Sequence, residues 1–217
     1  MSGLDQFIAP TKAGDLRRIG DVKGAATGWL IDQIRGKHQG PILMLCNDSE
    51  SASRIRREIR FFAGDALPVM LFPDWETLAY DSFSPHQDIT STRLETLYRL
   101  QGLKSGVIVV PASTAMQRVA PKEFVSGNVF WLEKGQLLDA DRMREQLIDA
   151  GYNLVDTVYE HGEFAVRGAI IDLYPTGTSA PLRIDLFDDE IDTLRTFDPE
   201  TQRSIEQIER IRILPAR

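Results

Sequence analysis

Apolar residues follow two different patterns along this chain of 217 residues. In the first half, short continuous apolar runs at residues 41–46, 68–73 and 106–112 are separated by segments with helical spacing. A continuous apolar run of this length is typical of a strand that is covered on both faces. Because such strands alternate with helices here, the pattern predicts an α/β fold, a parallel sheet with flanking helices.

The helices expected in this half cover residues 24–35, 47–64 and 88–103. In the second of them, Ile55 and Ile59 recur at helical spacing, a Ser or Asp opens the segment, and a glycine closes it. The third carries its leucines on one side. Each helix therefore has an apolar face to place against the sheet.

The second half changes to strands in succession, with a single amphipathic helix at residues 140–150. The expected strands follow this helix, at residues 152–160, 162–175, 181–190, 191–198 and 205–215. Consecutive strands joined by short turns make an antiparallel sheet, so this half is predicted to be a small α+β domain. We place the boundary between the two domains near residues 126–128.

The composition and net charge of the chain limit the classes of function that it could have. The net charge of −7, from 32 acidic and 25 basic residues, argues against binding of nucleic acid through a general basic field. The single cysteine, Cys46, excludes an internal disulfide and a cysteine-based zinc site, and it favours the cytoplasm. We also expect no signal peptide and no membrane association, because no suitable apolar segment is present.

A glycine-rich segment at residues 19–33 raises the possibility of a phosphate-binding loop. Such a loop needs glycines for close backbone approach, a lysine for the phosphate charge, and a hydroxyl for magnesium. Gly24 is in place, but Thr27 occupies the lysine position and Gly28 the hydroxyl position, and Lys23 lies on the wrong side of the turn. We therefore interpret the segment as a degenerate, non-functional loop that packs a helix tightly on a sheet.

Several longer motifs occur in one order along the chain: "FPDWETLAYDSFSPHQDITSTRLETLYRL", "VIVVPASTAMQRVAP", "EHGEFAVRGAIIDLYPTG" and "RIDLFDDEIDTLRTFD" followed by "LPA". Together they resemble the N-terminal region of bacterial transcription-repair coupling factors, which is itself similar to the excision-repair helicase subunit UvrB. The resemblance implies a helicase-like first domain without nucleotide chemistry, at residues 1–127. It also implies an α+β domain at residues 128–212 that binds the damage-recognition ATPase UvrA.

The chain departs from UvrB after "YDSFSP", where UvrB carries an aromatic hairpin that clamps DNA. Here the sequence runs directly into the helix near Ile89. The complete coupling factors also have an RNA-polymerase-binding domain and a DNA translocase motor, so the chain is expected to be a fragment that meets RNA polymerase and DNA only through absent parts. Residues 213–217 would begin a return segment to the first domain, whose missing remainder would leave apolar surface exposed.

The strand at residues 181–190 predicts a partner surface. Period two places one set of side chains, Leu182, Ile184 and Leu186, toward the helix. The opposite set, Arg183, Asp185 and Phe187, would then face outward, and arginine beside an exposed aromatic is typical of an interface hot spot. The alternative is that Phe187 is covered by a neighbouring segment and that Arg183 pairs with Asp185.

Arg167 precedes Gly168 within the apolar run at residues 162–175, where a glycine often marks a bulge that redirects side chains. The resemblance implies that two arginines and a phenylalanine of these strands contact UvrA. They correspond to Arg167, Arg183 and Phe187.

The leading hypothesis is a non-catalytic recruitment module of transcription-coupled nucleotide excision repair, with no cofactor in this chain. An ATP-hydrolysing helicase domain and a DNA-binding module are the alternatives. No metal site is expected, because the histidines have no ligand spacing. The acidic run at residues 188–192 is expected to be a solvated hairpin turn.

Overall fold

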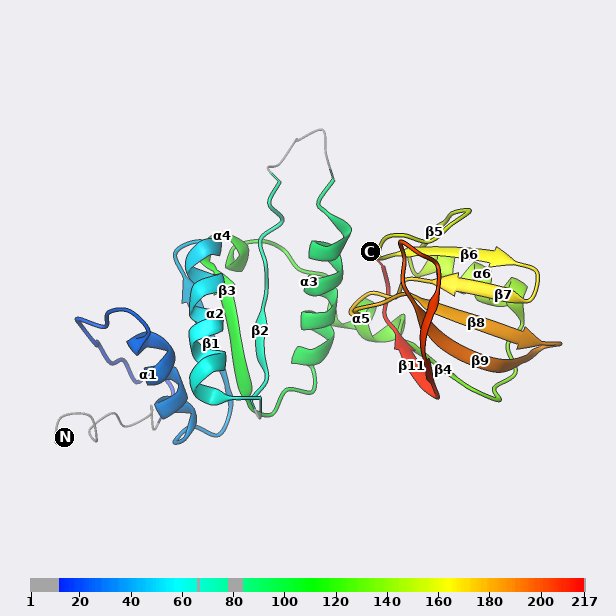
Figure 1. The fold of residues 1–217 in the computed structure, drawn as a ribbon. Helices are drawn as coiled ribbons and strands as arrows, with labels where there is room; N and C mark the ends of the chain where they lie inside the picture. Colours follow the sequence, from blue (N-terminus) through cyan, green and yellow to red (C-terminus); the bar gives the residue numbers. More distant parts are fainter. Residues whose placement is uncertain (1–11, 66, 78–83, 217) are drawn as a thin grey trace. The chain divides into compact units, whose positions relative to one another are not determined.

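The computed structural model describes residues 12–65, 67–77 and 84–216 of the chain (Figure 1). These residues fall into two compact units, which are described separately. The first unit contains the described residues of 1–74 together with 102–118, and the second contains those of 75–101 together with 119–217.

The first unit is built on a parallel sheet with the strand order β1-β3-β2. The strands are β1 (Pro41–Cys46), β2 (Val69–Leu71) and β3 (Gly106–Pro111), and both outer strands pair with β3 in parallel. The central strand is buried along its whole length. The predicted parallel sheet is thus confirmed, as a three-stranded sheet within the described residues.

Helix α2 (Ser49–Ala63) covers one face of this sheet. Its start is capped by Asp48, whose side chain accepts a hydrogen bond from the backbone N–H of Ser51, as expected of an acidic N-cap. Ile55 and Ile59 are buried against strands of the sheet. Helix α1 (Ala26–Arg35) packs on α2 (Figure 1), and a short helix, α4 (Ala112–Ala115), follows β3.

Strand β1 corrects one expectation, because only one of its faces is covered. Ile42 and Met44 pack into the core beneath α2, whereas Leu43 and Leu45 are 62% and 54% exposed. An apolar run does not distinguish a central strand from an edge strand, and β1 lies at the edge.

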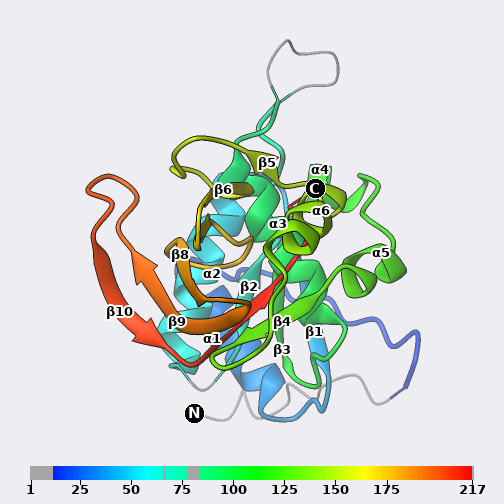
Figure 2. The ribbon, with the colours of Figure 1, turned by 90° about the vertical axis from the view of Figure 1, so that its right-hand side faces the viewer.

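The second unit contains a six-stranded sheet with the order β10-β9-β8-β7-β6-β5, and Figure 2 shows β10 beside β9 at one edge of it. Its strands are β5 (Asn153–Leu154), β6 (Glu163–Arg167), β7 (Ile170–Leu173), β8 (Leu182–Phe187), β9 (Glu190–Phe197) and β10 (Ser204–Ile208). All neighbours are antiparallel except β5 and β6, which are parallel. Helix α6 (Ala140–Asp149) buries Met143 and Leu147 in the core that covers the inner face of the sheet.

Three predicted strands need correction. Residues 162–175 form the hairpin β6–β7, because the backbone turns at Gly168 and Ala169. Residues 205–215 divide between β10 and β11 (Arg210–Ile213), and β11 pairs with β4 (Phe130–Glu133) in a separate two-stranded sheet. Of residues 152–160, only the two residues of β5 are strand.

Two helices that precede the predicted boundary group with the second unit: α3 (Gln87–Leu100) and α5 (Lys122–Gly127). For example, the Ser91 hydroxyl of α3 accepts a 2.8 Å hydrogen bond from the backbone N–H of Gly177. Ile213 and Ala216 are buried in the core of the same unit. The assignment of residues 1–127, 128–212 and 213–217 to family domains stays a prediction.

The part of the chain where UvrB carries its DNA-clamping hairpin includes residues 78–83, which lie outside the described residues. Among the described helices, none combines the length and the apolar character that crossing a bilayer requires.

Candidate protein-binding surface

The outer face of the six-stranded sheet, opposite α6, carries an arginine–aspartate network. Strand register places Asp172 of β7 directly opposite Arg183 of β8, which in turn lies opposite Arg195 of β9. Side chains of directly opposed residues project from the same face of a sheet. The three charged side chains therefore form one row across three strands.

Asp172 is the centre of this network. Its side chain is fully buried, and its carboxylate accepts hydrogen bonds from Arg183 Nε at 2.7 Å and from Arg183 Nη2 at 2.9 Å. Arg167, at the end of β6, donates a further hydrogen bond to the same carboxylate. Two of the three predicted contact residues are thus held by one buried aspartate, which supplies the partner that a buried charge requires.

Arg183 also makes contacts that stabilise the fold of the second unit. Its guanidinium lies 4.7 Å from the centre of the Phe197 ring and donates a 3.1 Å hydrogen bond to the carbonyl oxygen of Gln202. Hydrogen bonds accepted by Asp172 raise the pKa of Arg183 above its ordinary value. Only 15% of the Arg183 side chain is exposed, so its guanidinium is largely buried in these contacts.

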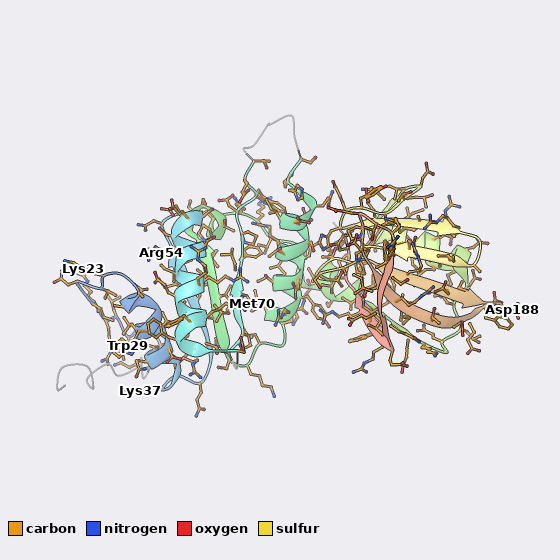
Figure 3. All side chains as sticks on the ribbon, in the orientation of Figure 1. Lys23, Trp29, Lys37, Arg54, Met70 and Asp188 are labelled. Carbon is orange, nitrogen blue, oxygen red and sulfur yellow. The ribbon has the colours of Figure 1, made fainter. Side chains whose placement is uncertain are left out.

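Phe187 ends strand β8 and is 74% exposed. It precedes the turn at Asp188 and Asp189, and Figure 3 marks this turn at Asp188. The prediction that Phe187 faces solvent is confirmed, and the alternative of a covered ring is wrong. The acidic run at residues 188–192 begins as the expected hairpin turn.

The alternative pairing of Arg183 with Asp185 is also wrong. Asp185 instead accepts hydrogen bonds from Arg195 Nη2 at 2.5 Å and from the Thr193 hydroxyl at 2.6 Å, both of strand β9. Period two puts Arg183 and Asp185 on one face, as predicted, but each finds its partner across the sheet rather than along the strand. The outer face therefore carries two separate ion-pair groups.

Gly168 lies in the β6–β7 turn, so the expectation of a bulge at this glycine is wrong. Its φ of +61° suits the first central position of a two-residue hairpin turn, where glycine is favoured. Arg167 is the last residue of β6 before this turn. Its side chain is 48% exposed, considerably more than that of Arg183.

The glycine-rich segment of the first unit shows a packing role. A Cβ built on Gly28 would lie 2.7 Å from the Glu58 backbone carbon, so only glycine allows α1 this close to α2. The expectation of packing on a sheet is corrected, because the partner is a helix. Gly24 has a φ of +57°, Thr27 belongs to α1, and the described residues 12–23 before them form no strand. A degenerate helicase-type phosphate loop is therefore not confirmed.

Sequence reasoning missed Asp172 and Arg195. Asp172 was detectable in principle, since it is a lone acid within the otherwise apolar strand β7, and such a residue needs a partner when buried. Arg195 gave no comparable signal. In the part of the chain that the structure describes, no group of three or more His, Cys, Asp or Glu side chains could hold a metal ion.

Comparison with known proteins relates this surface to a protein family and to several similar proteins. Residues 130–217, which contain the whole outer face, match the family described as the UvrB interaction domain. The transcription-repair-coupling factor of Escherichia coli K12 is 49% identical over 97% of the chain, and that of Haemophilus influenzae is 46% identical over 95%. The Bacillus subtilis factor is 27% identical over 92% of the chain. The chain spans 18%, 18% and 17% of the lengths of these three relatives.

Proposed function

We propose a recruitment function, because residues 130–217 match the UvrB interaction domain family and the chain is similar over nearly its whole length to transcription-repair-coupling factors. The second unit binds UvrA through Arg167, Arg183 and Phe187 on the outer face of its sheet. The chain acts in the cytoplasm as a non-catalytic module of transcription-coupled nucleotide excision repair.

The observation that carries the proposal is the exposure of Phe187 on the same face of the sheet as a fixed arginine pair. An aromatic ring that is 74% exposed supplies apolar area at the end of β8, and the arginines held by Asp172 supply donors that lose little freedom on binding. Arginine and aromatic side chains are enriched among residues that dominate binding energy. An acidic and apolar patch on UvrA would match this surface.

Calorimetry of the 217-residue protein with UvrA tests the proposal. Phe187→Ala and Arg167→Ala are the informative variants, because both side chains are well exposed and, without Arg167, the Asp172 carboxylate keeps both hydrogen bonds from Arg183. We expect Phe187→Ala to weaken binding by about 2 kcal/mol, roughly thirtyfold, with a smaller loss for Arg167→Ala. Ile148→Ala is the matched control, since Ile148 is 50% exposed on α6, away from the outer face.

Arg183 needs a different variant, because its removal would leave the buried Asp172 short of partners. Arg183→Lys keeps the positive charge but loses the forked geometry that the carboxylate uses. Wild-type affinity in both Phe187→Ala and Arg167→Ala, beside measurable binding of the unmodified protein, would exclude the outer face as the UvrA site.

The proposal assigns no ATP hydrolysis and no cofactor to this chain. Thr27 stands where a phosphate loop has its lysine, and Gly28 is accounted for by contact with α2. Contacts with RNA polymerase and with DNA would belong to other parts of a longer protein. ATP turnover by the purified chain that disappears on Gly24→Ala substitution would contradict this assignment.

A further inference from the structure

Leu137 lies beside the proposed surface, although it is far from Phe187 in sequence. Leu137 and Glu190 form an isolated antiparallel bridge, flanked by hydrogen bonds from the Leu138 N–H to the Asp189 oxygen at 2.7 Å and from the Ile191 N–H to the Gln136 oxygen at 2.9 Å. The segment that precedes α6 thus extends the sheet beyond β9 at the turn of the β8–β9 hairpin.

Glu190 lies between Phe187 and Leu137 in the register of the strands. Phe187 is its registered partner on β8, and Leu137 is its partner on the other side. Because directly opposed residues project from one face, Phe187, Glu190 and Leu137 form a row on the outer face. A Cβ built on Gly135 would lie 3.8 Å from Glu190 Oε1, so the acid leans over this segment, and Leu138 points the opposite way into the core.

Leu137 is 76% exposed, which is as much as Phe187 at 74%. Single exposed leucines are common on protein surfaces and mean little alone. Here two large apolar side chains are aligned across one acid, roughly 10 Å apart by the spacing of strands. The row also continues the face that carries the arginines.

We propose that Leu137 is a second apolar anchor for UvrA, an inference that depends on the function proposed above. The occupant would be an apolar surface of UvrA wide enough to cover both side chains, with a hydrogen-bond donor or positive charge facing Glu190. If UvrA covers both apolar side chains, it also covers Glu190 between them. A buried carboxylate needs a hydrogen-bond donor or a positive charge, so charge complementarity favours such a group on UvrA opposite Glu190. The contact area then extends from Arg167 across Phe187 to Leu137.

Calorimetry with UvrA would compare Leu137→Ala and Leu137→Met with the unmodified 217-residue protein. We expect Leu137→Ala to weaken affinity about tenfold, whereas Leu137→Met, which keeps the apolar volume, stays within about threefold. Ile148→Ala should bind like the unmodified protein. Thermal unfolding should show that Leu137→Ala folds normally, as expected for an exposed side chain.

The outcomes separate the two proposals. If Phe187→Ala weakens binding and Leu137→Ala does not, the anchor is wrong and the proposed function stands. If the unmodified protein does not bind UvrA, both are wrong. If Leu137→Ala and Ile148→Ala weaken binding equally, the effect is not specific to the row, and the anchor is again wrong.

Discussion

The exposed sides of two strands, β1 in the first unit and β8 in the second, are built differently. On β1 the exposed residues are Leu43 and Leu45, which are apolar. The outer face of β8 instead carries Arg183 and Asp185, each largely buried and held by a charged partner on a neighbouring strand, followed by the exposed Phe187. One face is apolar and makes no directional contacts, and the other has a fixed arrangement of donors.

This difference matters for both stability and recognition. Apolar contacts are non-directional, so an exposed leucine can be exchanged without disturbing its neighbours. When a buried carboxylate pairs with two arginines, replacing it leaves both arginines without their partner. Substitutions on the two faces should therefore differ by several kcal/mol, although both faces belong to well-formed sheets.

The largest effect is expected for Asp172→Asn. The substitution keeps the shape of the side chain but removes the charge that holds Arg167 and Arg183, and breaking such a buried pair typically costs about 3–5 kcal/mol. Amide hydrogen exchange, measured separately in the strands of the two units, should show the loss in the second unit only. UvrA affinity should fall as well, because the arginines lose their fixed geometry.

Asp185→Asn is the matched control for this prediction. Asp185 and its partner Arg195 are 23% and 36% exposed at the side chain, so solvent screens their pair, and we expect a loss below about 1 kcal/mol. Equal losses in the free energy of unfolding for Asp172→Asn and Asp185→Asn would show that burial of Asp172 does not set the strength of its ion pairs.

The next largest effect is a dependence of stability on pH, which we expect from the titration of Tyr152. Its hydroxyl donates a 2.6 Å hydrogen bond to the Leu214 carbonyl oxygen, and burial raises the pKa of Tyr152 to about 12. The stabilisation is therefore complete below about pH 10 and is lost as the pH rises toward 12, by up to about 3 kcal/mol. Urea unfolding from pH 8 to 12 should show this decline in the second unit.

Tyr152→Phe separates this titration from that of other groups. The variant should lose about 1 kcal/mol at pH 8, where one hydrogen bond is missing, and should then decline less steeply than the unmodified protein. The first unit contains no tyrosine, so its response should be the same in both proteins. Identical pH slopes in the second unit would contradict the assignment to Tyr152.

Gly28→Ala should have an intermediate effect on the first unit. The added methyl would overlap the Glu58 backbone in α2, and overpacking costs about 1–3 kcal/mol, partly offset by about 1 kcal/mol of helix propensity. We expect a net loss of up to about 2 kcal/mol in the free energy of unfolding, measured with urea. Gly36→Ala is the control at the other end of α1, because its new Cβ would meet the nearest atom at 3.5 Å.

The alternation along β8 could be predicted because an antiparallel sheet with one solvated face imposes period two on every strand. That rule alone placed Leu182 and Ile184 inside and Phe187 outside. It could not place Asp172, because its contact with Arg183 depends on the register between two strands, which a single strand does not encode.

Turns and strand order were harder to predict for related reasons. The β6–β7 turn at Gly168 and Ala169 lies within an apolar run and lacks the Asn-Gly or Asp-Gly pair that usually marks a hairpin. Strand β1 has the composition of a central strand, and its position at the edge is decided by tertiary packing. Gly28 stands where a phosphate loop has its hydroxyl residue, and the sequence alone could not show that close packing on α2 requires glycine there.

The smallest effect is expected on β1. Leu43→Thr and Leu45→Thr replace side chains that are 62% and 54% exposed, and threonine is well suited to an edge strand, so stability should change by no more than about 0.5 kcal/mol. UvrA affinity should be unchanged, since the proposed contacts are all in the second unit. Leu182→Ala, at a fully buried position of β8, should cost about 2–5 kcal/mol under the same conditions. A loss above about 1 kcal/mol in the threonine variants would mean that these leucines are covered in solution, and the contrast between β1 and β8 would then not hold.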